Sequence, residues 1–139
     1  MSDDKIFLDT NILIYAYDLT AGKKHETAKK IIVELWDSGF GVLSTQVLQE
    51  FFVNVTQKIP KPLDVDLAKG IVSDLLKWDV VINDGECILA AIEIQSKYKY
   101  SFLDSLIIEA AISGGAALLF SEDLSDGQII KGLTIKNPF

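Results

Sequence analysis

The sequence contains no arginine. All 13 of its basic residues are lysine, and they stand against 20 acidic residues, which leaves a formal net charge of −7. A protein that holds nucleic acid through surface charge alone is usually basic. The composition therefore excludes simple charge-driven binding of a polyanion. Any phosphate ligand would need another source of positive charge, and a bound divalent cation could supply it.

Cysteine and histidine are almost as scarce. Cys87 is the only cysteine, so the chain can form no internal disulfide, which fits a reducing compartment. His25 is the only histidine, and it falls near the start of a predicted helix. A zinc site therefore lacks ligands, and catalysis by a serine–histidine or cysteine–histidine pair would have to use His25. The sequence also has no P-loop and no G-x-G-x-x-G segment.

Long apolar runs are missing too. No stretch reaches the length that spans a bilayer, and the opening "MSDDK" is unlike a signal peptide. We therefore expect a soluble, cytoplasmic protein without a membrane partner. A chain of 139 residues predicts a single domain over residues 1–139. A chain of this size buries roughly 68–70% of its unfolded surface, and the 49% apolar content can supply such a core.

Helical and strand patterns alternate along the chain. That alternation predicts an α/β fold, with a mostly parallel sheet and helices on both faces. In such folds the functional crevice lies beyond the carboxyl ends of the strands. The predicted strands are residues 6–8, 39–45, 78–83, 116–121 and 132–137, and the predicted helices are residues 24–37, 46–58, 66–77, 85–97 and 101–115.

Two acidic residues stand in apolar surroundings. Asp9 directly follows the first predicted strand in "IFLDTNILI", where a carboxylate loses water and needs a partner. Asp104 lies in the first turn of its helix, on the same face as Ile107 and Ile108. Both have a purely structural alternative. Asp9 could cap a following helix, and Asp104 has capping-box spacing from Ser101.

Two further acids could reach the same edge of the sheet. Glu50 lies at the border of the apolar stripe of helix 46–58, and the alternative is an ordinary surface glutamate. Asp123 comes two residues after Ser121, which should end a strand in "FSEDLSDG". The alternative there is a solvated acidic loop. Asp126 of the same loop could supplement or replace Asp123.

Convergence of these acids would require a counter-charge. Two charges ~4 Å apart interact by about 4 kcal/mol at an effective dielectric constant of 20. Such a cluster persists if its members share protons or bind a cation, and hard carboxylate oxygens select Mg²⁺ or Mn²⁺. We therefore predict a site for one of these cations, formed by Asp9, Glu50, Asp104 and Asp123.

Four segments of the chain resemble the signature segments of PIN-domain ribonucleases, in the same order. They are "FLDTNILIYAYD", "LQEFF", "FLDSLIIEAA" and "LLFSEDLSDG", and VapC-like toxins of toxin–antitoxin pairs are the nearest likeness. The resemblance implies a PIN-like, three-layer α/β/α domain with about five strands. It implies hydrolysis of RNA phosphodiesters with Mg²⁺ or Mn²⁺ as the cofactor. It also implies an antitoxin partner and a homodimer.

The resemblance assigns roles to the acids one by one. Asp9, Glu50 and Asp104 match the first three acids of the family, which would be catalytic and would hold the cation. Asp123 matches the fourth, which often acts through water. Asp126 remains its possible supplement or replacement.

Other residues receive supporting roles. Ser121 matches the hydroxyl residue that precedes the fourth acid, and Asn11 matches an asparagine that orders the site. Thr10 would contribute a hydroxyl or backbone group. An all-lysine basic set provides no bidentate arginine clamp for phosphate. The candidate phosphate contacts are Lys23, Lys24 and Lys97.

Three other functions stay open. A receiver-type phosphoacceptor domain also places acids and Mg²⁺ at strand ends, but it needs a lysine ending the last strand, and none follows "LLFS". An aspartate-nucleophile phosphatase needs Asp-x-Asp where this chain has Asp9-Thr10-Asn11. A PIN-like module kept only for binding would have no use for the full set of acids.

Overall fold

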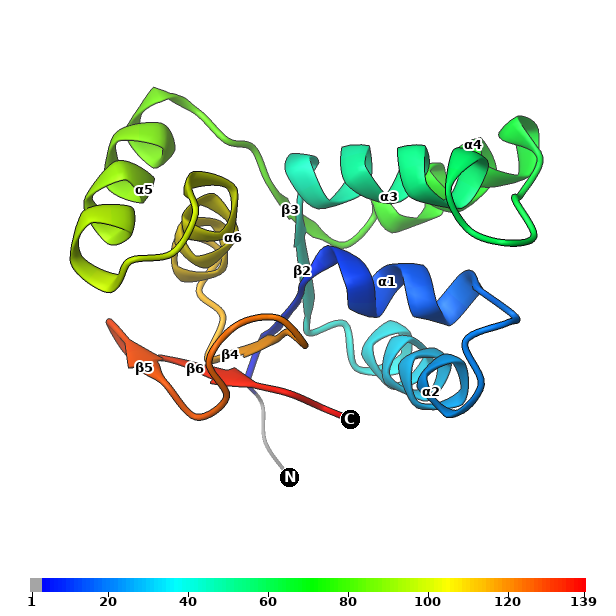
Figure 1. The fold of residues 1–139 in the computed structure, drawn as a ribbon, viewed down its shortest axis with the longest axis horizontal. Coiled ribbons are helices and arrows are strands. Elements are labelled where there is room, and N and C mark those ends of the chain that lie inside the picture. Colours follow the sequence, from blue (N-terminus) through cyan, green and yellow to red (C-terminus); the bar gives the residue numbers. More distant parts are fainter. Residues whose placement is uncertain (1–3) are drawn as a thin grey trace.

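The computed structural model describes residues 4–139, which contain a six-stranded sheet (Figure 1). The strand order is β3-β2-β1-β4-β6-β5, and every neighbouring pair is parallel except β5 and β6. The strands are β1 (Ile6–Leu8), β2 (Gly41–Ser44), β3 (Asp79–Val81), β4 (Leu118–Phe120), β5 (Ile129–Ile130) and β6 (Leu133–Lys136).

Helices cover both sides of this sheet. In Figure 1, α1 to α4 gather on one side and α5 and α6 on the other, so the predicted three-layer α/β/α fold with a mostly parallel sheet is confirmed. The helices are α1 (Thr10–Tyr17), α2 (Lys23–Ser38), α3 (Thr45–Gln57), α4 (Val65–Leu75), α5 (Gly85–Tyr98) and α6 (Phe102–Ser113).

Two elements were absent from the predicted set. α1 is apolar on nearly every side because it is buried beside α2 and α3, so it shows no clear periodicity. β5 has only two residues and pairs with β6 across a turn at Lys131 and Gly132, both with positive φ. The sheet therefore has six strands where about five were expected.

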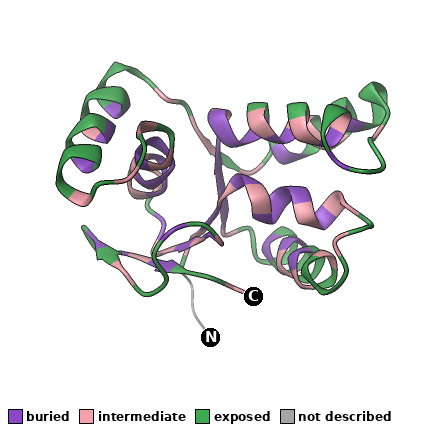
Figure 2. Cartoon of the chain, in the orientation of Figure 1, coloured by how far each residue is buried: buried purple, intermediate pink, exposed green. Residues whose placement is uncertain are grey.

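The hydrophobic core includes the central strands of the sheet. Phe7 and Leu8 of β1 are fully buried, as expected for a parallel strand covered on both faces. Figure 2 shows buried residues along the sheet-facing sides of the helices, with exposed residues on their outer sides. No helix between residues 4 and 139 is long and apolar enough to cross a membrane.

Two glycines permit close approach of the layers. A Cβ atom on Gly41 would overlap the Trp78 ring, which packs edge-on against Trp36 with centroids 5.4 Å apart. A Cβ atom on Gly114 would lie 2.7 Å from Val42 Cγ1. These positions therefore fix how closely β2 meets its neighbours.

The strand order creates a switch point between β1 and β4. From β1 the sheet extends through β2 and β3 on one side, and through β4, β6 and β5 on the other. Ligands of open α/β sheets bind at such a point, outside the carboxyl ends of the strands. Asp9 directly follows β1 and Ser121 directly follows β4, so both lie at this edge.

Candidate active site

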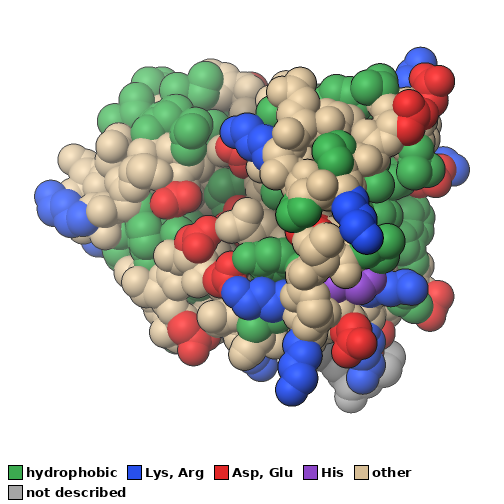
Figure 3. Space-filling model, turned by 45° about the vertical axis from the view of Figure 1, so that its right-hand side comes forward, with side chains coloured by type: hydrophobic (Ala, Val, Ile, Leu, Met, Phe, Trp, Pro, Cys, Tyr) green, Lys and Arg blue, Asp and Glu red, His purple; other side chains and the backbone are tan. Residues whose placement is uncertain are grey.

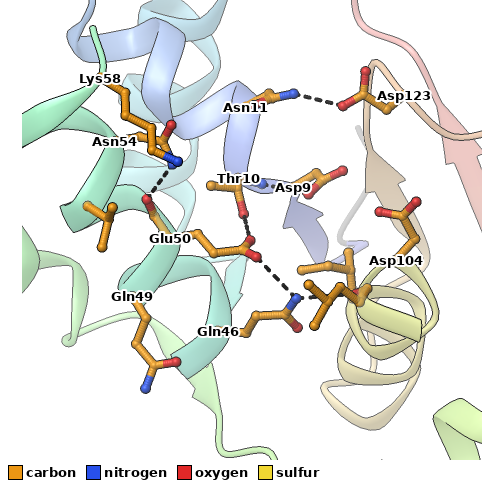
Figure 4. Close-up of a pocket in the computed structure, with 13 residues that line it drawn as sticks. Asp9, Thr10, Asn11, Gln46, Gln49, Glu50, Asn54, Lys58, Asp104 and Asp123 are labelled. Carbon is orange, nitrogen blue, oxygen red and sulfur yellow. Dashed lines mark hydrogen bonds between the residues drawn. The ribbon is translucent and has the colours of Figure 1, made fainter. Parts of the chain in front are cut away.

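The four acids predicted to converge line one hollow of about 470 Å³ at the switch point (Figure 4). Asp9 comes from the end of β1, Glu50 from α3, Asp104 from α6 and Asp123 from the loop after β4. The remaining lining residues are Thr10, Asn11, Gln46, Gln49, Val53, Asn54, Lys58, Leu103 and Ile107.

Asp9 both caps a helix and faces the hollow. It is the N-cap of α1, where its Oδ1 accepts a hydrogen bond from Thr10 N at 2.7 Å. Its Oδ2 accepts one from Ser121 Oγ at 2.8 Å. Burial raises the pKa of Asp9 to about 6 against the opposing effect of these two bonds, and the carboxylates of Asp104 and Asp123 add to the increase. The capping alternative and the site prediction therefore describe the same side chain.

Thr10 connects two of the acids. While its backbone N–H bonds Asp9, its Oγ1 donates to Glu50 Oε1 at 2.7 Å. Gln46 Nε2 donates to Glu50 Oε2 at 3.5 Å and to the Leu103 carbonyl at 3.2 Å, which links α3 to α6. Glu50 is thus held by neighbours on both sides and is not an unconstrained surface glutamate.

Asp104 presents its carboxylate to the hollow. Ser101 is the N-cap of α6, and its Oγ accepts from Asp104 N at 3.1 Å. The reciprocal capping-box bond, in which the Ser101 N–H would donate to the Asp104 carboxylate, is absent from the hydrogen bonds of the described residues. Figure 4 shows the Asp104 carboxylate on the same side of the hollow as Asp123.

The two candidate site acids of the loop after β4, Asp123 and Asp126, make contacts in different places. Asp123 Oδ2 accepts from Asn11 Nδ2 at 2.7 Å, which connects the start of α1 to the loop after β4. Buried Ser121 accepts the Asp123 N–H at 3.3 Å and so holds the start of the loop. Asp126 instead accepts from Asn137 N at 2.8 Å and is not part of the hollow's lining. The geometry places Asp123 in the hollow and gives Asp126 a structural contact.

A comparison with protein families now bears on these residues. The PIN-domain family model matches residues 6–125. The chain belongs to the PIN-domain family. A search of curated proteins found no significant match.

The PIN domain described here shares its fold with solved bacterial toxins. It is similar to VapC20 of Mycobacterium tuberculosis, a sarcin–ricin loop cleaving toxin, with TM-score 0.66 and 20% identity over 86% of this chain and 90% of that one. It is similar to a chain of a toxin–antitoxin complex from Klebsiella pneumoniae, with TM-score 0.69 and 20% identity over 97% and 98%. It is also similar to a chain of DNA-bound VapBC from Salmonella typhimurium, with TM-score 0.68 and 17% identity over 97% and 98%.

The carboxylates of this PIN domain fit a hard cation chemically, although they are not already gathered around one point. Within residues 4–139, no three acidic, histidine or cysteine side chains form a ready-made metal site. Neutral donors from Thr10, Asn11 and Ser121 bond the acids instead. The hollow nevertheless offers carboxylate oxygens from four acids, and those of Asp104 and Asp123 add to the rise that burial causes in the pKa of Asp9. Mg²⁺ or Mn²⁺ suits that donor set.

The lysines predicted to contact phosphate lie elsewhere on the PIN domain. Lys24 forms an ion pair with Glu122, which also accepts a hydrogen bond from Tyr15 OH at 2.6 Å. The Nζ atom of Lys24 lies 5.3 Å from the centre of the Tyr15 ring and 5.7 Å from that of the Phe139 ring. Lys97 lies over the Tyr98 ring. Neither these two nor Lys23 lines the hollow.

Several lining residues escaped the sequence analysis. Those residues are Gln46, Gln49, Asn54 and Lys58. Gln46, Asn54 and Lys58 lie four or eight residues from Glu50, so helical spacing from Glu50 was the signal that could have found them. Gln49 directly precedes Glu50, and that spacing does not indicate it.

Proposed function

We propose that this protein is a metal-dependent endoribonuclease that hydrolyses RNA phosphodiesters, with residues 1–139 forming a single nuclease domain. One observation carries the proposal. Four carboxylates from four separate segments line one hollow at the switch point of a PIN-domain sheet. A purely structural role explains acids at helix caps, but it does not explain why four of them face the same hollow.

The cofactor in this proposal is Mg²⁺ or Mn²⁺, held by Asp9, Glu50, Asp104 and Asp123. When bound, such a cation lowers the pKa of water and offsets charge on the reacting phosphate. The chain's own residues position the acids. Ser121 and the Thr10 N–H fix both oxygens of Asp9, and the Thr10 hydroxyl fixes Glu50.

Asp123 has a role of its own in the proposed reaction. Its Oδ2 is held by Asn11, while none of the hydrogen bonds among the described residues engages its Oδ1. Oδ1 is therefore available to accept a hydrogen bond from the attacking water. That water adds to phosphorus, the bond from phosphorus to O3′ breaks and O3′ takes a proton, which leaves 5′-phosphate and 3′-hydroxyl ends.

The similar structures also support a biological setting. They include a toxin that cleaves the sarcin–ricin loop and chains from toxin–antitoxin complexes. We propose that this protein is likewise a cytoplasmic toxin with a cognate antitoxin, and that it forms a homodimer. The antitoxin would place a basic side chain among the acids, because a cation there offsets the same repulsion that the metal relieves.

Cleavage of labelled RNA in Mn²⁺ tests the enzymatic proposal. We expect cleavage by the wild type, loss of cleavage in EDTA, and a loss of at least about 100-fold in Asp104→Asn, because a charge at the metal is removed. Asp126→Asn is the matched control from outside the hollow and should retain activity. Equal activity of the wild type and Asp104→Asn would refute the assigned site.

The same preparation separates the remaining alternatives. Calorimetric binding of Mn²⁺ without any cleavage would favour a PIN-like module retained for binding. Stable labelling of one aspartate by a small phosphodonor would favour the receiver-type reaction, which membership of the PIN-domain family does not support.

A further inference from the structure

The proposed substrate poses an electrostatic problem for this chain. RNA is a polyanion, whereas the protein carries a net charge of −7 and has no arginine. On the face shown in Figure 3, lysines are interspersed with acidic side chains and do not form one continuous basic patch. A metal ion would offset charge at the scissile phosphate, but the neighbouring phosphates would still face an acidic surface.

Lys58 is the one lysine of the 13 that lines the acidic hollow. It is the C-cap residue of α3, and its backbone N–H bonds the Asn54 carbonyl. In the view of Figure 4 its side chain lies beside Asn54, across the hollow from Asp104 and Asp123. A positive charge is thus present on the α3 wall of the hollow, to which Glu50 contributes the one carboxylate among the four acids.

The Lys58 ammonium group is not engaged within the described part of the chain. Lys5, Lys24 and Lys77 make ion pairs there, whereas Lys58 Nζ makes neither a hydrogen bond nor an ion pair with any residue between 4 and 139. The side chain is exposed and has a flexible four-carbon stem. It can therefore take an external anion without breaking an internal contact.

Helical spacing connects Lys58 with the acids. Gln46, Glu50, Asn54 and Lys58 follow one another at intervals of four residues, and all of them line the hollow. We call these four residues the α3 ridge. With a rise of 1.5 Å per residue, Lys58 lies about 12 Å along the helix axis from Glu50. Its backbone is therefore about two turns of α3 away from Glu50, and its side chain lies beside Asn54, between Glu50 and the end of the helix.

We propose that Lys58 binds a phosphate of the RNA strand that flanks the scissile one, and that the α3 ridge forms the wall along which the strand lies. This inference rests on the proposed ribonuclease function. It assigns Lys58 to substrate binding and not to the chemical step. A competing explanation is purely structural, since a cation at a helix C-terminus stabilises the helix by roughly 0.3–1 kcal/mol.

The test compares Lys58→Gln with the matched control Lys61→Gln, which removes an exposed lysine three residues further on and outside the hollow. Binding of a labelled single-stranded oligoribonucleotide is followed by fluorescence anisotropy at several salt concentrations in Mg²⁺. An Asp104→Asn background prevents cleavage during these titrations. Steady-state cleavage in Mn²⁺ is measured for each lysine variant without that background substitution.

A lost phosphate contact should have a specific signature. We expect Lys58→Gln to lower the slope of log affinity against log salt by about 0.7, the value for one phosphate of a single strand. KM should rise up to roughly tenfold with kcat little changed, because the contact is made equally in the ground and transition states. Lys61→Gln should match the parent protein in all three quantities.

The other outcomes overturn the inference in distinguishable ways. If the wild type cleaves RNA and Lys58→Gln keeps its salt slope and KM, the Lys58 proposal fails while the ribonuclease proposal stands. If Lys58→Gln lowers only the midpoint of thermal unfolding, the helix-terminal explanation is correct. If the parent protein neither cleaves nor binds RNA, both proposals fail together.

Discussion

The side chain of Asp9 has one effect that stabilises the fold and another that destabilises it. Its Oδ1 caps α1, which favours folding, yet the carboxylate is desolvated at the edge of the core and faces two other acids. A carboxylate that stays charged there reduces stability, and the proposed cation site would account for that cost.

We expect Asp9→Asn to raise the free energy of unfolding of the metal-free protein at pH 7.5 by about 1–3 kcal/mol. The pKa of Asp9 is raised from 3.8 to about 6 in the folded state. The native protein therefore holds this proton more tightly, and the wild type loses stability as the pH rises from about 4 to 6. Above that range the penalty is constant, at about 1.4 kcal/mol per pKa unit before solvent screening.

Urea denaturation in EDTA at pH 4 and pH 7.5 checks this prediction. The difference between the variant and the wild type should be small at pH 4 and largest at pH 7.5. The same difference at both pH values would show that the effect comes from packing and not from charge.

At the scale of residues, the sequence indicated the acids that line the hollow better than it indicated the other residues around them. Asp9 and Asp123 were found because strand ends share one edge of a parallel sheet, and Asp104 because it interrupts an apolar helical face. The choice between Asp123 and Asp126 depends on which one reaches Asn11, and loop spacing carries no such information. Lys58 was missed because an exposed lysine at a helix end is ordinary in composition.

At the scale of elements, close packing around β2 determines how the layers meet. Gly41 gives the Trp78 ring the space it occupies, and Gly114 at the end of α6 approaches Val42. By contrast, Gly70 lies on the exposed surface of α4 with nothing near the position of an added Cβ atom. An added methyl group is therefore expected to destabilise the protein at Gly41 and to fit without a clash at Gly70.

We predict that Gly41→Ala lowers the free energy of unfolding by about 1–3 kcal/mol, because the methyl group forces the Trp78 ring to move. Gly70→Ala should raise it by roughly 0.5–1 kcal/mol, because alanine loses less conformational entropy in a helix. Denaturant titration of both variants measures the two signs. A stabilised Gly41→Ala protein would mean that Trp78 has room that the structure does not show.

The helices and strands were predictable where periodicity or capping chemistry was strong. Asp84 and Ser101 cap α5 and α6 through their side chains. Asp64 occupies the N-cap of α4, but its side chain makes no capping hydrogen bond. β5 could not be predicted because two residues carry no alternation, and its pairing depends on β6.

At the scale of the whole molecule, the site exists only in the folded chain. Its four acids come from four elements or loops that the strand order 3-2-1-4-6-5 brings to one edge. That edge was predictable from the alternation of helices and strands, whereas the hydrogen bonds that neutral donors make to the acids were not. A ligand of this edge binds the native state and has little affinity for the unfolded chain, so it should stabilise the whole fold.

We therefore expect Mn²⁺ to raise the midpoint of thermal unfolding more than NaCl of equal ionic strength does. A concentration of 100 times Kd would add about 2.7 kcal/mol. General screening of the net charge of −7 contributes to both salts, and the comparison removes it. Asp104→Asn should lose the additional shift in Mn²⁺. Identical shifts in the two salts would argue against a specific cation site.

The packing of Phe139 on Tyr15 has a practical consequence for handling the protein. Tyr15 bonds Glu122, the residue next to Asp123, so the end of β6 and the acidic loop are mechanically connected. An affinity tag joined after Phe139 would therefore begin beside the loop that carries Asp123. Cleavable tags at this position should be removed before kinetic measurements.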